Sequence, residues 1–424
     1  MTNFYFFFYA IALFFSVHSF DRNDPINVLV IWSSLFSIYL VSFRYLRNLT
    51  TKQLLYSGIL FRVVTIGAIP SLSDDFYRFL WDGYLVSRSI SPFAYSPSEF
   101  LEQGTPLTEE ALFLYRNMNS QIYYSVYPPL LQTLFYLPWL LVHSFFAKVI
   151  LLQFVLFDFE ILNLFLIAND KEKSKNEFWI YAGNPLVIIE SISQIHPEPI
   201  LVFLILISFR LFFAKHFTGF QFIFSLFLQI KMSLVFLVPG GYFSIPPKKR
   251  TGFVLIVLLS VAVLAFSLFS KLGNQASSGI GLFFHSFRFH SLFEYLIYFV
   301  LSLFGDFTYL SGTIALLTGG VVYLLYLYKR SYDLKEAIFT GFLIMILFSP
   351  VIHPWYVLPL FAVLNSKFPY PGVFLVFSIF SGLSYLLYSI QYTFFSEIFF
   401  MIEGGSLLAC IYGKSCINYF RQKS

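Results

Sequence analysis

Four ionisable residues lie close together directly after an apolar segment that ends at Pro70. They are Asp74, Asp75, Arg78 and Asp82, in a chain of which only 12% of the residues are charged. In a helix, Asp74, Arg78 and Asp82 recur at every fourth position and therefore share one face. Carboxylates around a guanidinium at the mouth of a membrane span are suited to acid–base chemistry beside a charged lipid headgroup.

The same residues also have a structural interpretation. Ser71 and Asp74 have the spacing of a capping box, and Ser73 or Asp74 could serve as a simple helix N-cap. Arg78 could be an ordinary partner for the acids one helical turn away on either side. A cap does not require four charges at a membrane edge, so we favour the functional interpretation.

The elements that must position this cluster are membrane helices. The 424 residues are 58% hydrophobic and 22% aromatic, with a mean hydropathy of +0.74. Repeated apolar runs predict an all-α, polytopic protein with about 11–13 spans in one membrane domain, residues 1–424, and both termini in the cytoplasm. Basic cytoplasmic loops account for the net charge of +5, which gives no reason to expect a nucleic-acid partner.

The loop topology predicts which side of the membrane the cluster faces. Spans are expected at 3–20, 26–43 and 53–70, and the basic loop at 44–52 belongs in the cytoplasm by the positive-inside rule. Residues 71–126 then form a long extracytoplasmic loop, with a helix at 107–118 and short helices at the interface. Part of 127–168, part of 217–243 and the stretch 292–305 are expected to be half-helices, re-entrant segments or surface helices.

Further polar side chains occur where membrane helices should begin or end, and intramembrane ionisable groups are functional candidates. Each also has a simpler explanation as a solvated turn, a snorkelling lysine or an interfacial aromatic belt. Five clusters from distant segments nevertheless share the predicted outer side. The four besides the 74–82 cluster are the 184–198 segment with Asn184, Glu190, His196 and Glu198; Lys231; the loop 271–291 with Arg288; and the turn with His353, Trp355 and Tyr356.

Several motifs, taken in order, resemble the GT-C glycosyltransferases, and most closely the bacterial polyprenyl-phosphate-mannose-dependent mannosyltransferase-like proteins. The resemblance rests on Ser-Asp-Asp-Phe-Tyr-Arg-Phe-Leu-Trp-Asp-Gly at 73–83 and Tyr-Pro-Pro-Leu-Leu-Gln at 127–132, followed by the motifs at 184–198, 231–239 and 353–356. The chain departs from the family at 89–93, where Ser-Ile-Ser-Pro-Phe replaces the usual Gly-Ile-Asn-Pro-Tyr.

The resemblance implies transfer of a hexose, with mannose favoured, from a polyprenyl-phosphate donor to a glycan or glycolipid acceptor. The reaction would take place at the outer leaflet of the bacterial inner (cytoplasmic) membrane. By position, the general base is Asp74 or Asp75, and the motif does not distinguish them. The residues expected to bind substrate are Arg78, Trp81, Asp82, Tyr127, Gln132, Asn184, Glu190, His196, Glu198, Lys231, Arg288, His353, Trp355 and Tyr356.

A single displacement would invert the anomeric centre, and the leaving phosphate would need a cation such as Arg78, Lys231 or Arg288. The scheme requires no cofactor, although the carboxylates with His196 leave a divalent cation open. A transporter or flippase of lipid-linked sugars is the competing class, and the absence of internal repeats argues against it. A non-catalytic scaffold would leave the five polar clusters unexplained, and arabinose, glucose or an amino sugar are the alternative donors.

Overall fold

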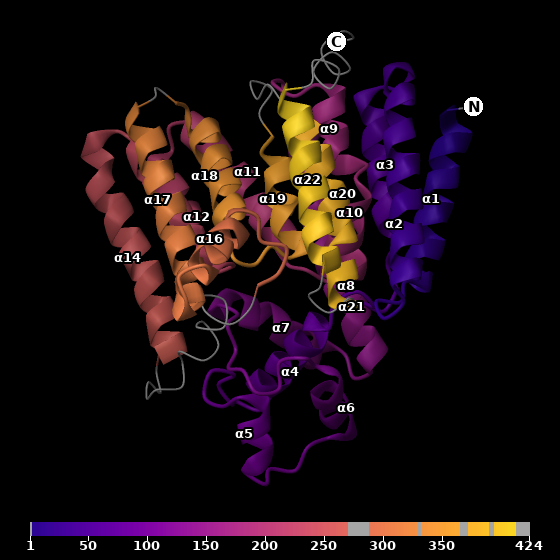
Figure 1. The fold of residues 1–424 in the computed structure, drawn as a ribbon. Helices are drawn as coiled ribbons and strands as arrows, with labels where there is room; N and C mark the ends of the chain where they lie inside the picture. The colour runs from indigo at the N-terminus through magenta and orange to yellow at the C-terminus, as the bar shows by residue number, and fades with distance from the viewer. Residues whose placement is uncertain (1, 270–287, 330–331, 365–371, 390–393, 413–424) are drawn as a thin grey trace.

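The computed structural model describes residues 2–269, 288–329, 332–364, 372–389 and 394–412. Within these ranges every regular element is helical, and the sole β-type contact is an isolated parallel bridge between Phe289 and Val351. The predicted all-α membrane architecture is therefore confirmed. Figure 1 shows long helices side by side in the upper part of the molecule and α4 to α7 gathered beneath them.

The second and third helices begin at clear caps. Helix α1 spans Thr2–Ser19, α2 spans Pro25–Ser42 and α3 spans Thr51–Val63, with the short η1 (Phe43–Asn48) between the last two. Asp24 accepts hydrogen bonds from two backbone N–H groups at the start of α2, and Thr50 begins α3 with a capping box. The expectation of a helix over 53–70 was wrong at its C-terminal end. The chain leaves the helix after Val63, turns at Gly67 with φ of +90°, and donates the Gly67 N–H to Gln153.

The predicted loop after Pro70 is folded rather than extended. It contains α4 (Asp75–Ser87), α5 (Pro97–Glu102) and α6 (Glu109–Asn117), followed by α7 (Pro129–Leu141). The helix expected at 107–118 is confirmed as α6. Prolines at the first turns of α5 and α7, where no N–H is needed, favour helix initiation. Helix α4 packs chiefly on α7, and the rings of Phe79 and Phe135 stack with centroids 4.5 Å apart.

The remaining chain builds the rest of the bundle. Its helical elements are α8 (Phe145–Ala168), α9 (Lys175–Ala182), α10 (Pro185–Ile188), η2 (Ile189–Ser193), α11 (Glu198–Phe213), α12 (Phe217–Ser225), η3 (Met232–Leu237), α13 (Val238–Ser244), α14 (Pro247–Phe269), α16 (Phe293–Ser302), η5 (Asp306–Leu310), α17 (Ser311–Lys329), α18 (Leu334–Phe348), η6 (Pro354–Val357), α19 (Leu358–Ala362), α20 (Gly372–Leu383), α21 (Leu386–Ser389) and α22 (Phe394–Tyr412).

Among the described residues, four helices are long and apolar enough to cross a membrane, and the bent pair 185–193 and 198–213 adds a fifth if it counts as one span. Shorter apolar helices occur at five further places, including Pro129–Leu141, Met232–Ser244 and Phe293–Ser302. These three lie in the segments that the sequence analysis assigned to half-helices or surface helices. The predicted total of about 11–13 spans stays a prediction.

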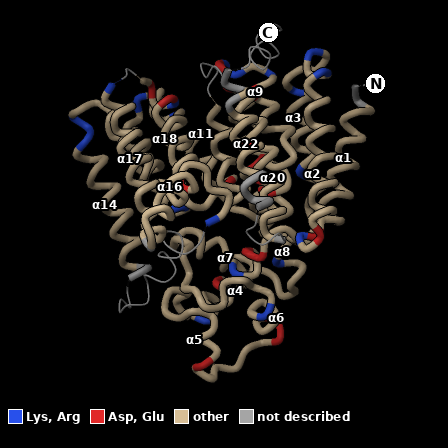
Figure 2. Tube along the Cα trace, viewed as in Figure 1, with Lys and Arg blue, Asp and Glu red and all other residues tan. Residues whose placement is uncertain are grey.

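Basic side chains gather at the end of the bundle opposite α4–α6. Figure 2 shows Lys and Arg along the upper rim, where α3, α9 and α18 end or begin. Two contacts hold distant segments together at this end. Lys175 donates to the carbonyl of Leu49, with a distance of 2.6 Å, and Nζ of Lys335 lies 3.1 Å from a carboxylate oxygen of Asp170. The molecule therefore has one basic end and one end that carries the folded loop.

A charged pair lies fully buried among the membrane helices. Nε of Arg62 on α3 is 2.6 Å from Oε2 of Glu160 on α8, and both side chains have 0% exposure. Arg62 also donates to the carbonyl of Ala182, and the Tyr181 hydroxyl donates to Glu160. Because ionised side chains are costly in a membrane, this pair requires the close packing of α3, α8 and α9 that satisfies it.

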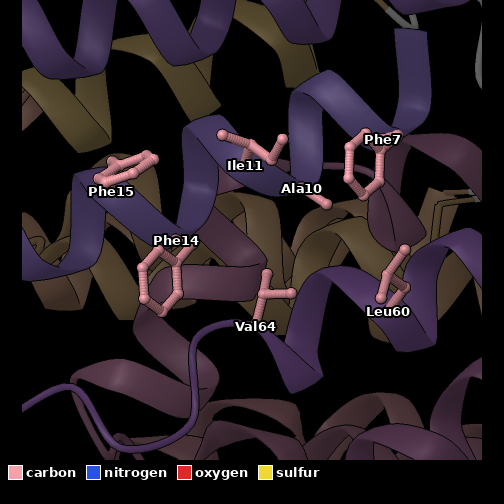
Figure 3. A pocket seen from close by; sticks show the side chains of 7 residues that line it. All are labelled: Phe7, Ala10, Ile11, Phe14, Phe15, Leu60 and Val64. Atoms are coloured by element: carbon pink, nitrogen blue, oxygen red, sulfur yellow. The ribbon is translucent and has the colours of Figure 1, made fainter. Parts of the chain in front are cut away.

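The outer surface of α1 and α3 carries a shallow apolar hollow. Figure 3 shows Phe7 and Phe14 of α1 facing Leu60 and Val64, at the end of α3, with Phe15 further along α1. The hollow has no polar lining, and four of its phenylalanine and isoleucine side chains are more than a third exposed. Such a surface suits contact with lipid chains, and it contains none of the polar residues described below.

Candidate active site

Two adjacent carboxylates at the start of α4 have different partners. Asp74 occupies the N-cap position, but its side chain caps no backbone N–H. Its Oδ2 instead accepts a hydrogen bond from Nη2 of Arg22, with a distance of 2.7 Å, and both side chains are mostly buried. Arg22 lies in the α1–α2 turn and its guanidinium is 5.6 Å from the centroid of the Tyr388 ring. Asp74 thus ties that turn to α4.

Among the described residues, no cation forms an ion pair with the Asp75 carboxylate. Its backbone N–H donates to Oγ of Ser73, and Tyr127 donates a side-chain hydrogen bond to its carboxylate. Although part of Asp75 reaches solvent, protein surrounds the carboxyl group closely. Burial, followed by the negative charges of Asp74 and Glu198, raises the pKa of Asp75 from 3.8 to about 6. A carboxylate with that pKa is ionised at neutral pH and basic enough to accept a proton.

The other half of the motif anchors the loop. Nε of Arg78 lies 2.7 Å from Oδ1 of Asp82, and its Nη1 donates to the carbonyls of Ser120 and Tyr123. Asp82 is fully buried, and its Oδ2 accepts hydrogen bonds from Ser125 at 2.5 Å and Gln132 at 3.0 Å. This network joins three parts of the chain: helix α4, the segment that follows α6, and helix α7. For Arg78, Asp82 and Gln132, these contacts favour the structural interpretation over direct substrate contact.

Trp81 also faces into the loop rather than toward Asp75. Its indole is fully buried, and its ring packs against Tyr84, Phe100 and Tyr115 at centroid distances of 6.0 Å. Tyr127 differs, because it reaches Asp75 while its ring packs edge-on against Phe79. In the 127–132 motif, Tyr127 therefore contacts the Asp75 carboxylate, and Gln132 belongs to the network of Arg78 and Asp82.

The membrane segment 185–213 breaks where the His-Pro-Glu motif lies. The axes on either side of the break differ by 113°, and η2 before it is a π-helix. Ile195 has φ of 60°, a left-handed conformation that is strained for a β-branched residue. π-Helical turns and strained backbone frequently mark functional sites. The break brings Glu190, His196 and Glu198 together at the end of the bundle that holds α4.

Some polar atoms of these three residues have hydrogen-bond partners among the described residues, and others do not. The Tyr385 hydroxyl donates to Glu190 at 3.0 Å. Nδ1 of His196 is 2.9 Å from Oε2 of Glu190, but the orientation does not meet hydrogen-bond geometry, and neither ring nitrogen of His196 has a hydrogen-bond partner. Oε1 of Glu198 is 3.1 Å from Nζ of Lys231, whereas its Oε2 is buried without a partner.

Lys231 completes the connection to Asp75. Its ammonium lies between Glu198 and the ring of Tyr356, 3.1 Å from the ring centroid. The Asp75 carboxylate is close enough to act electrostatically on Lys231, Glu198 and Glu190. We call Asp75, Glu190, His196, Glu198 and Lys231 the Asp75 cluster.

Aromatic and imidazole rings of the 353–356 turn pack against this cluster. The Trp355 indole stacks on His196 on one side, with centroids 3.7 Å apart and planes 12° apart, and on His353 at 4.5 Å and 2°. Nδ1 of His353 is 3.1 Å from the Tyr388 hydroxyl. Since two imidazoles already stack on the Trp355 indole, the expected stacking of this residue on a sugar is not favoured by the geometry.

Two predicted substrate-binding residues lie in other networks. Oδ1 of Asn184 accepts the Leu186 N–H at the start of α10 and the Ser378 hydroxyl. Nε of Arg288 is 2.7 Å from a carboxylate oxygen of Glu294. These contacts give Asn184 a capping role and place Arg288 in a neighbouring buried network. Residues 270–287 of the predicted outer loop lie outside the described part of the chain.

Sequence reasoning missed three residues that border the cluster, Arg22, Tyr385 and Tyr388. Arg22 pairs with Asp74 across 52 positions. Tyr385, directly before α21, reaches Glu190, and Tyr388 on α21 reaches His353. The one signal in the sequence is the charged turn at 21–24, between two apolar segments. Tyrosines in an aromatic-rich apolar segment carry no comparable signal.

The cluster combines a proton acceptor, carboxylates and a cation, which suits transfer chemistry on a polar, phosphate-bearing substrate. Within the described residues, no group of three or more His, Cys, Asp or Glu side chains is arranged to hold a metal ion.

Comparison with known proteins gives one family. The model of the alpha-(1->6)-mannopyranosyltransferase N-terminal domain matches residues 14–244, more than half of the 424-residue chain. The match includes α4, the anchor network and every member of the Asp75 cluster, and ends before the 353–356 turn. Neither the curated proteins nor the solved structures contain a match. The chain therefore belongs to the alpha-(1->6)-mannopyranosyltransferase family and is a membrane mannosyltransferase of the GT-C type.

Proposed function

We propose that the protein transfers mannose from a polyprenyl-phosphate-linked donor to a hydroxyl of a lipid or glycan acceptor, with Asp75 as the general base. The observation that carries this proposal is the contrast between the two aspartates. Asp74 is paired with Arg22, whereas Asp75 has a pKa raised to about 6 and lies beside Lys231 and Glu198. The choice between Asp74 and Asp75, which the motif left open, therefore falls on Asp75.

The proposed step is a single displacement. The acceptor oxygen attacks the anomeric carbon of mannose while its proton passes to the Asp75 carboxylate. The bond from the anomeric carbon to the phosphate oxygen breaks, and its electron pair leaves with the polyprenyl phosphate. Attack opposite the leaving group inverts the anomeric centre, so formation of the alpha linkage named by the family requires a beta-linked donor. The scheme needs no metal ion.

The leaving phosphate gains charge and needs a cation. Each of the three cations considered from sequence has a carboxylate partner: Arg78 pairs with Asp82, Arg288 with Glu294 and Lys231 with Glu198. Of the three, Lys231 is the one in the Asp75 cluster, where it interacts electrostatically with Asp75. We assign the phosphate to Lys231. Arg22 lies on the Asp74 side of Asp75 and can add a second positive charge.

The distribution of basic residues supports an orientation in the membrane. Lys and Arg gather at the end opposite α4–α6 (Figure 2), which the positive-inside rule assigns to the cytoplasm. In the proposal, residues 71–126 and the Asp75 cluster then face the extracytoplasmic side of the bacterial inner membrane. The family match over residues 14–244 includes this loop, which agrees with a catalytic role for it.

The test is transfer of radiolabelled mannose from polyprenyl-phosphate-mannose, as separate alpha and beta anomers, in proteoliposomes containing an extract of glycan and lipid acceptors. We expect the wild-type protein to form a new glycosidic bond from the beta anomer alone, and Asp75→Asn to abolish it. Full activity of Asp75→Asn would eliminate the assigned base. Movement of labelled donor across the bilayer without a new bond would instead favour the flippase alternative.

A further inference from the structure

Two buried polar side chains of the Asp75 cluster have atoms without partners, and we propose that they bind the sugar ring of the donor. In this assignment Glu198 and His196 hydrogen-bond neighbouring ring hydroxyls of the pyranose, while Lys231 takes the phosphate. The inference rests on the proposed function and specifies which part of the donor each side of the cluster recognises.

Glu198 provides the first observation. Its side chain is 5% exposed, and Oε1 is held by Lys231 at 3.1 Å, but Oε2 has no hydrogen-bond partner among the described residues. A carboxylate oxygen buried without a donor is unfavourable unless a ligand supplies one. Sugar hydroxyls are such donors. The negative charge of Glu198 also acts on the proposed base, Asp75.

His196 provides the second, independent observation. It is fully buried, and among the described residues neither Nδ1 nor Nε2 has a hydrogen-bond partner, although Nδ1 lies 2.9 Å from Oε2 of Glu190. Stacking on Trp355 and the left-handed conformation of Ile195 fix the orientation of its ring. A neutral imidazole has one N–H donor and one acceptor nitrogen, and because Nδ1 lies against Glu190, Nε2 is the nitrogen that can bond a sugar hydroxyl. The strained backbone is thus explained if it aims this ring at a ligand.

The charge of the cluster explains why we place the sugar, rather than the phosphate, beside Glu198 and His196. The negative charges of Glu190 and Glu198 interact with that of Asp75, so this side of the cluster is acidic. It repels a phosphate and suits neutral hydroxyl donors. Because imidazoles stack on Trp355, recognition here relies on hydrogen bonds rather than on an aromatic platform.

The experiment pairs enzyme variants with altered donors. Wild type and Glu198→Gln are each given polyprenyl-phosphate-mannose and its 2-deoxy, 3-deoxy, 4-deoxy and 6-deoxy forms. Binding is measured in detergent by competition with a fluorescent donor, and transfer is measured in proteoliposomes. Glu110→Gln is the matched control, because Glu110 is also paired with a lysine, Lys148, but lies on α6 outside the cluster.

We expect Glu198→Gln to weaken binding of the full donor about 10- to 100-fold, the range for losing a hydrogen bond to a charged group. For one deoxy donor the loss should vanish, because the hydroxyl that Glu198 would bind is already missing. His196→Gln should show the same coupling at a neighbouring position. If either variant fails to fold, the coupling of the other decides the question. Equal losses with all five donors would overturn the inference.

The two readouts separate this inference from the proposed function. Coupling in binding without transfer by the wild-type protein would support sugar recognition and refute the proposed reaction. Transfer without coupling would leave the reaction intact and refute the sugar assignment. If the donor does not bind to the wild-type protein, both fail.

Discussion

Replacing Asp75 by Asn should reduce activity and increase stability at the same time. The pKa of Asp75 is raised from 3.8 to about 6, so the folded protein holds its proton more tightly than the unfolded chain. The stability associated with that proton is fully present below pH of about 4 and is lost as the pH rises through about 6. Asparagine carries no charge at any pH and avoids this loss.

The size of the effect follows from the shift. Roughly two pKa units correspond to at most about 3 kcal/mol at pH 8, and partial solvent access of Asp75 reduces this value. Loss of a general base lowers the rate by about 10²- to 10⁴-fold. A variant that is inactive because it is misfolded would show the opposite change in stability.

The assay compares mannose transfer in proteoliposomes with thermal unfolding in detergent at pH 4 and pH 8. Asp75→Asn should unfold at a higher temperature than wild type at pH 8, with the difference largely gone at pH 4. Asp74→Asn is the matched control, because it removes a partly exposed pair with Arg22 worth about 0–1 kcal/mol. An Asp75→Asn protein with a rate within about threefold of wild type would refute the assignment of the base.

Four further predictions follow from the same contacts. Activity of the wild-type protein should rise with pH and reach half its plateau near the Asp75 pKa of about 6, and a rate independent of pH between 5 and 8 would contradict the base assignment. If Lys231 stabilises the leaving phosphate, Lys231→Met should lower the transfer rate about 10²- to 10³-fold. Weaker donor binding with an unchanged rate would instead show that Lys231 only binds the intact donor. Asp82→Ala should destabilise the fold by about 3–5 kcal/mol in thermal unfolding, because it leaves the buried Arg78 without its carboxylate. Gly83→Ala should also lower the unfolding temperature, since a Cβ there would lie 2.0 Å from the carbonyl oxygen of Phe135, and an unchanged value would show that α4 and α7 separate easily.

Local sequence patterns predicted the all-helical class, the helix at 107–118 and three of the five shorter apolar helices. The spacing of Arg78 and Asp82 correctly indicated that they share a helix face, because one turn brings residues four apart together. The prediction of a span to residue 70 failed because hydropathy does not register a helix end stabilised by contacts from elsewhere. Here Gln153, on another helix, accepts the N–H of Gly67.

Long-range partnerships were the part that sequence could not supply. Nothing local indicates that Asp74 should meet Arg22, or that Arg62 and Glu160 should pair inside the membrane. The latter two residues interrupt apolar runs and could have been recognised as costly charges, but their partner could not. Residue type likewise suggested that Trp355 would contact sugar, whereas the fold stacks histidines on it.

The residues of the 73–83 motif have different roles. One residue, Asp75, is assigned to chemistry, while Asp74, Arg78 and Asp82 hold α4 to the α1–α2 turn, the loop and α7. Gly83 permits the close approach of α7. Most of the motif therefore serves to fix the helix that carries the base. A proton acceptor must lie within hydrogen-bond reach of the acceptor hydroxyl, so an error of about 1 Å in α4 would cost more activity than a modest change in the pKa of Asp75.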